Sequence, residues 1–133
     1  MTGKASRDKG ARGELAVIKI IRDELGQVCN RNYKQTAQAQ HGDIEQLVGP
    51  YLIEVKNCVR LDLPKWWRQA CAAADAHPRK PHPCVAYNAG RGRWRFVIPN
   101  PEFWDNGTQW GREVEYQRDL WRQGFFSIVR EQL

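Results

Sequence analysis

The segment Tyr51–Cys58 constrains the fold most strongly, because its side chains alternate as in a strand that is half buried. Successive side chains of a strand point to opposite faces of its sheet, so Ile53 and Val55 are expected to face a core. By the same alternation Glu54 and Lys56 share the other face. The segment therefore predicts a strand that presents a carboxylate and an ammonium group side by side.

The other segments predict how helices and strands are arranged around this strand. Apolar residues recur at helical intervals over Ser6–Leu25, and Gly26 stands where a helix commonly ends. Gly49-Pro50 predicts a tight turn that joins Tyr51–Cys58 to a preceding strand, Asp43–Val48, as a hairpin. The remaining predicted elements are a short strand at Gln27–Asn30, a loop over Asn32–Gly42, a helix from Pro64 to Ala74, a second hairpin of Cys84–Asn88 and Arg93–Ile98, and a short helix at Phe125–Leu133. This order favours an α/β fold with a mixed central sheet flanked by helices.

Length and composition limit the class of protein. The chain has 133 residues and a formal net charge of +6, which suits a single domain with an anionic partner, nucleic acid before a membrane surface. Its hydrophobic content is 41%, and no apolar run approaches the ~18 residues that a membrane span needs. The four cysteines form no CxxC pair, which argues against a structural zinc site and for reduced thiols in the cytoplasm.

Two carboxylates give the predicted hairpin a chemical role. Asp43 begins the first strand, so its side chain can lie near Glu54 across the pair. Converging carboxylate oxygens suit Mg²⁺, and Lys56 is placed to orient a water or to stabilise charge on phosphorus. These groups predict phosphodiester hydrolysis. The alternative is an ordinary exposed ion pair between Glu54 and Lys56 on a strand.

Two motifs carry a resemblance to a known superfamily. Gly42-Asp43, ten intervening residues and then Glu54-Val55-Lys56 resemble the signature of the PD-(D/E)XK nucleases, with Gly42 where proline is usual. The opening Lys9-Gly10-Ala11-Arg12-Gly13-Glu14 is similar to that of archaeal-type Holliday junction resolvases and related phage nucleases. The resemblance covers residues 6–98 and implies a restriction-endonuclease-like core with the order αβββαβ. Residues 1–133 are then expected to form one nuclease domain, with 99–133 as a C-terminal extension of open role.

The resemblance also implies a set of site residues. Mg²⁺, for which Mn²⁺ can substitute, would be held by Glu14, Asp43 and Glu54 with the Val55 carbonyl, and Lys56 would assist the attacking water. Gln69, on the helix after the hairpin, looks like a glutamine that several branches place beside the active site. The tyrosine that exonuclease-like branches carry four residues later is replaced by Ala73, which disfavours an exonuclease. The related resolvases suggest a homodimer that acts on branched DNA, whereas short phage and plasmid members cut or nick plain duplex.

Basic residues gather on the two predicted helices. The candidates for contact with DNA phosphates are Arg7, Lys9, Arg12, Lys65 and Arg68, and the alternative is that these charges are simply solvated. The adjacent Trp66 and Trp67 are not expected to face the same core, so one of them is predicted to be exposed or to lie at an interface. Two other classes stay open: a DNA-binding accessory protein that kept the fold without catalysis, and a basic structural protein.

Overall fold

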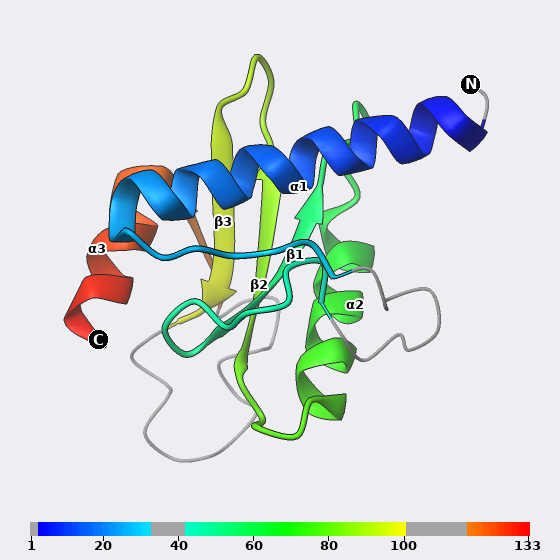
Figure 1. Cartoon of the computed structure of the whole chain (residues 1–133). Coiled ribbons are helices and arrows are strands. Elements are labelled where there is room, and N and C mark those ends of the chain that lie inside the picture. Colours follow the sequence, from blue (N-terminus) through cyan, green and yellow to red (C-terminus); the bar gives the residue numbers. More distant parts are fainter. Residues whose placement is uncertain (1–2, 33–41, 101–116) are drawn as a thin grey trace.

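A four-stranded mixed sheet organises the molecule. The computed structural model describes residues 3–32, 42–100 and 117–133 (Figure 1). The strands are β1 (Tyr51–Lys56), β2 (His82–Asn88), β3 (Trp94–Pro99) and β4 (Gln117–Trp121). They lie in the order β1-β2-β3-β4, with β1 parallel to β2 and the other neighbours antiparallel. The predicted α/β class with a mixed sheet flanked by helices is confirmed.

In the described part of the chain, three helices cover the two faces of this sheet. They are α1 (Gly3–Leu25), α2 (Leu63–Ala76) and α3 (Arg122–Glu131). Buried side chains of α1 and α3 pack against the face of β1 that carries Ile53 and Val55, while those of α2 pack on the opposite face. Figure 1 shows α1 crossing the strands, with its N-terminal half reaching past β1. The alternation predicted for β1 is therefore confirmed, and both of its faces are covered by helices.

The helix ends follow from local sequence. Gly26 has a φ of +71°, a conformation that side chains with a Cβ rarely adopt, and its N–H bonds to the Arg22 carbonyl at 2.8 Å, which closes α1. Pro64 lies in the first turn of α2, where backbone N–H groups have no intrahelical acceptor. The N–H that proline lacks therefore costs the helix little. At the other end of α2, His77 is extended and precedes Pro78.

The predicted first hairpin is wrong. In the described residues, 43–48 form no strand, and β1 pairs with β2 instead. Val48 and Tyr51 do exchange two backbone hydrogen bonds, of 2.9 and 3.0 Å, around the predicted Gly49-Pro50 turn. The ladder does not extend from there, because the Val55 N–H bonds to the Asp43 side chain rather than to a backbone carbonyl. Over the described residues the element order is thus αβαβββα, not αβββαβ.

Two smaller predictions also need comment. Residues 27–30 form no strand, although Arg31 makes an isolated bridge with Ile44. The loop predicted over Asn32–Gly42 lies outside the described residues except for its two ends.

The C-terminal part adds to the sheet and the core. Residues 101–116 lie outside the described residues, but β4 extends the sheet next to β3, and Phe125, Phe126 and Val129 of α3 are fully buried. The Phe125 ring stacks on Phe96 at a centroid distance of 4.5 Å. The part of the expected extension that begins at Gln117 is thus built into the same core as the strands.

Both tryptophans of α2 are buried in one core, which contradicts the expectation that they would not face the same core. Trp66 is 6% exposed and Trp67 2%, and they belong to one apolar cluster with Tyr87 and Val97. Adjacent helical residues are about 100° apart, so both can flank the line along which a helix meets a broad sheet.

Candidate active site

The Asp43 carboxylate lies against the free edge of β1. Asp43 is buried, and its Oδ2 accepts a hydrogen bond of 2.7 Å from the Val55 N–H. The segment that carries Asp43 is fixed by Asn32, whose N–H donates to the Asp43 carbonyl and whose side-chain amide donates to the Gly42 carbonyl, both at 3.0 Å. The Val55 N–H thus holds the Asp43 carboxylate beside β1, and Asn32 holds the backbone that carries it.

Gly42, which stands where the superfamily usually has proline, packs tightly against β1. A Cβ at this position would lie 3.0 Å from the Ile53 carbonyl oxygen and 3.0 Å from the Leu52 side chain. Glycine therefore lets the backbone before Asp43 approach the edge of the strand closely.

Glu54 and Lys56 project from β1 on the α2 side. The Lys56 ammonium donates a hydrogen bond of 2.9 Å to the Gln69 side-chain oxygen on α2. The structure thus brings together Lys56 and Gln69, two of the residues chosen from sequence. Because Gln69 is neutral, this contact orients the ammonium without cancelling its charge.

The electrostatics of Glu54 mark the site. Burial, and after it the charge and the hydrogen bond of the neighbouring Asp43 carboxyl group, raise the pKa of Glu54 from 4.5 to about 9, while Lys56 acts in the opposite direction. Two carboxyl groups this close cannot both be charged at low cost unless a cation joins them or one of them holds a proton. Asp43 and Glu54 therefore form a hydrogen-bonded acidic pair, in which Asp43 is buried and Glu54 is half-buried.

Glu14 approaches this pair from α1. A Cβ added at the preceding Gly13 would lie only 2.7 Å from the Asn57 Cβ, so glycine is what lets α1 come this close to the end of β1. Burial raises the pKa of Glu14, and a 2.5 Å hydrogen bond from the Arg31 guanidinium acts against that rise. The charge of Asp43 adds to the rise, which places Glu14 within the electrostatic reach of the pair.

The donor set can be compared with what a divalent cation needs. In a strand the N–H and C=O of one residue point to the same edge, so the Val55 carbonyl faces the side of Asp43. Carboxylate and carbonyl oxygens are the ligands that Mg²⁺ and Mn²⁺ favour, and an acidic pair with excess negative charge suits them. Over the described ranges, no three Asp, Glu, His or Cys side chains already surround one point as ligands. Glu14 is instead turned towards Arg31.

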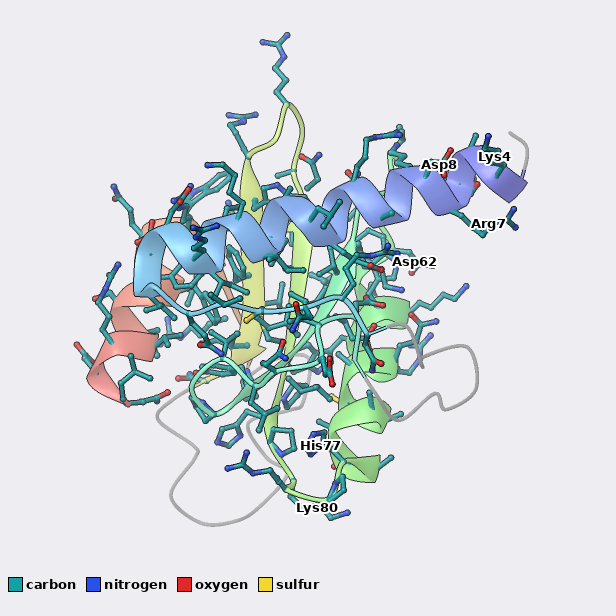
Figure 2. All side chains as sticks on the ribbon, in the orientation of Figure 1. Lys4, Arg7, Asp8, Asp62, His77 and Lys80 are labelled. Carbon is teal, nitrogen blue, oxygen red and sulfur yellow. The ribbon has the colours of Figure 1, made fainter. Side chains whose placement is uncertain are left out.

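The basic residues chosen from sequence lie on the helices that flank β1. Arg7 and Arg12 on α1 and Lys65 and Arg68 on α2 are exposed, and Lys9 is half buried. Figure 2 shows Lys4 and Arg7 near the N-terminal end of α1, beyond the strands. These cations are available to an anionic partner.

Three residues that sequence analysis did not single out help to position the site. They are Arg31, which engages Glu14; Asn32, which fixes the Asp43 segment; and Asn57, whose side chain donates to the Lys9 carbonyl at 2.9 Å. The only signal in the sequence was their place next to predicted elements, since Asn57 directly follows Lys56 and Arg31 follows Gln27–Asn30.

A mixed sheet with a Glu-x-Lys on its edge strand β1, an Asp on the segment beside that edge and a glutamate on the preceding helix is the arrangement of the PD-(D/E)XK nucleases. The model of the family described as "Phage putative PDDEXK endonuclease" matches residues 5–121, and the chain belongs to this family. No curated protein and no solved structure matches the chain. No helix in the described part of the chain is both long and apolar enough to cross a membrane.

Proposed function

We propose that this protein is a metal-dependent DNA endonuclease whose active site is the edge of β1. The observation that carries the proposal is the hydrogen-bonded acidic pair of Asp43 and Glu54 beside the Lys56 ammonium. Asp43, Glu54 and the Val55 carbonyl would hold Mg²⁺ or Mn²⁺, and Glu14 would join them when it exchanges Arg31 for the metal. Membership of the endonuclease family supports the reaction class.

The roles of this chain's residues follow from their contacts. A bound divalent ion would neutralise phosphate charge and lower the pKa of a water molecule. The Lys56 ammonium, held by Gln69, supplies positive charge where negative charge develops on the phosphate oxygens. The bond from the Val55 N–H keeps the Asp43 carboxylate in place, so this ligand needs little reorganisation.

The substrate side of the proposal is supported by charge. The net charge of +6 and the exposed cations of α1 and α2 favour DNA, with Arg7, Lys9, Arg12, Lys65 and Arg68 as phosphate contacts. We extend the proposal to branched DNA cut by a homodimer, because Lys9–Glu14 resembles the opening of Holliday junction resolvases. We extend it also to the cytoplasm, because the cysteine pattern favours reduced thiols.

A cleavage panel tests the proposal. Four-way junction, flap, nicked duplex, plain duplex and single strand are incubated with Mg²⁺, with Mn²⁺ or with EDTA. Metal-dependent cleavage of at least one DNA that Lys56→Ala abolishes, with DNA binding retained, supports the endonuclease. If the parent protein binds DNA but cuts none of the panel with either metal, the accessory DNA-binding role replaces it. A preference for the junction, together with a dimer in solution, supports the finer proposal.

A further inference from the structure

A cleft lies next to the proposed active site, outside the acidic pair. Its volume is about 520 Å³, within the range of sites that take small molecules. It is lined by residues at the carboxyl ends of two parallel strands, Asn57 and Cys58 after β1, and Asn88 and Ala89 at and after the end of β2. Ligands of sheets with parallel strands commonly bind at this end of the strands. Asn57 directly follows Lys56, so the cleft adjoins the proposed catalytic residues.

The charge of the cleft favours an anion. Lys9 of α1 and Arg91 of the β2–β3 turn both line it, and no carboxylate does so among the described residues. Figure 1 shows that this turn extends past α1, at the carboxyl end of β2. A phosphate group between α1 and the turn would meet positive charge from both sides.

The apolar lining favours a ligand that also carries a flat apolar group. The buried rings of Trp66 and Tyr87 line the cleft, with centroids 6.1 Å apart. Val59 and Leu61 also line the cleft and are 90% and 64% exposed, so they offer apolar surface to a ligand. A base that entered the cleft would cover these side chains.

Two amides supply polar groups for a base edge. Asn57 accepts a hydrogen bond of 3.0 Å from the Asn88 amide and donates one to the Lys9 carbonyl, and Asn88 accepts one from the Gly90 N–H. These bonds use one N–H and one lone pair of each amide, and an amide offers two of each. The remaining donors and acceptors suit the hydrogen-bonding edge of an unpaired base.

We infer that this cleft binds one unpaired nucleotide of the DNA substrate, with the base against Val59, Leu61 and Trp66 and its phosphate between Lys9 and Arg91. The inference rests on the proposed function, which makes DNA the substrate, and it restricts that substrate to DNA with an unpaired nucleotide. DNA with an extrahelical nucleotide beside the cleavage position is then the preferred substrate.

The test measures DNA binding in EDTA, where no cleavage occurs. A labelled duplex of about 20 base pairs carries one extrahelical nucleotide, and a matched duplex carries an abasic residue at that place. Fluorescence anisotropy is expected to give a Kd about tenfold lower for the duplex with the base. Leu61→Ser, at an exposed position, is expected to reduce that ratio to about twofold or less.

The phosphate contact is tested by a matched pair of substitutions. Arg91 has a φ of +55°, which asparagine tolerates, so Arg91→Asn removes the charge without strain in the turn. It should weaken binding of both duplexes about equally and by several fold. Arg79→Asn removes an exposed charge beside His77 and Lys80, at the other end of β2 (Figure 2), and should have little effect.

Equal affinity for the base-containing and abasic duplexes would overturn the inference, and so would an Arg79→Asn effect as large as that of Arg91→Asn. The proposed function fails by a different result, the absence of metal-dependent cleavage. Because the binding test contains no metal, the two failures are distinguishable.

Discussion

The Asp43 carboxylate takes the place of a neighbouring strand at Val55: its Oδ2 accepts the hydrogen bond that a β-ladder would otherwise make there, at 2.7 Å. This contact holds an acidic side chain against the edge of β1, one residue from Glu54 along the strand. It links the fold to the proposed chemistry, since the same bond ends the local pairing and positions the carboxylate.

Two substitutions at Asp43 separate its structural role from its charge. Asp43→Ala leaves the buried Val55 N–H without this acceptor and is expected to lower the free energy of unfolding by about 1–3 kcal/mol. Asp43→Asn keeps an acceptor oxygen and removes the charge next to Glu54, so metal-free stability at pH 8 should be unchanged or higher. Urea denaturation measures both. Equal losses in the two variants would contradict this account of the contact.

The stability of the metal-free protein should fall as the pH rises. The pKa of Glu54 is raised from 4.5 to about 9, so between these values the folded chain holds a proton that the unfolded chain has released. Unfolding then releases that proton, and the free energy of unfolding decreases by up to about 1.4 kcal/mol per pH unit. Thermal denaturation in EDTA at pH 6 and pH 8 measures the difference.

Glu54→Gln is the matched control for the pH dependence. The glutamine amide can donate to Asp43 as the protonated acid does, so the variant should show a flatter stability profile and exceed the wild-type stability at pH 8. A wild-type profile that is flat, or that rises between pH 6 and pH 8, would show that Glu54 is charged without a metal.

Gly13 and Gly10 offer a paired test of how closely α1 must approach β1. Gly13→Ala places a Cβ 2.7 Å from the Asn57 Cβ, so it should destabilise the protein by about 1–3 kcal/mol and displace Glu14. Gly10→Ala meets nothing within 4 Å and should stabilise α1 by about 0.5–1 kcal/mol. Chemical denaturation of both variants checks the opposite signs. Two stabilised variants would rule out the close approach.

Gln69 is expected to act through Lys56. Gln69→Ala removes the 2.9 Å contact with the ammonium and should slow cleavage by about three- to thirtyfold, less than the loss of about a hundredfold or more expected for Lys56→Ala. In the double variant the Gln69 substitution should have almost no further effect. Single-turnover rates of the four proteins give this comparison. Additive losses would mean that Gln69 contributes independently of Lys56.

Local patterns were enough to predict much of the fold. The alternation of β1, the end of α1 at Gly26 and the turn at Gly49-Pro50 depend on neighbouring residues, and all are present in the structure. The first hairpin was predicted wrongly because the Asp43 side chain, twelve residues before Val55, replaces the backbone partner. Spacing and alternation do not reveal that a side chain takes the place of a backbone hydrogen-bond partner.

Only part of the site could be predicted, because local motifs reveal some of its residues but not the contacts between distant parts of the sequence. Asp43, Glu54, Lys56 and Gln69 belong to short motifs and meet in the structure, and Glu14 lies within their electrostatic reach. Arg31 and Asn57 contact α1 across 17 and 48 residues of sequence, and no local pattern connects them to their partners. The burial of both Trp66 and Trp67 depends on the breadth of the sheet under α2, which the local sequence does not show.

The most direct test of the central claim is the rate of Mg²⁺-dependent DNA cleavage by Asp43→Asn relative to the wild type, at equal and saturating protein. If Asp43 and Glu54 form the catalytic acidic pair, the variant should fold, bind DNA with nearly unchanged affinity and cleave it about a hundredfold or more slowly. Cleavage by Asp43→Asn at the wild-type rate would contradict the claim and show that the active site is not at the edge of β1.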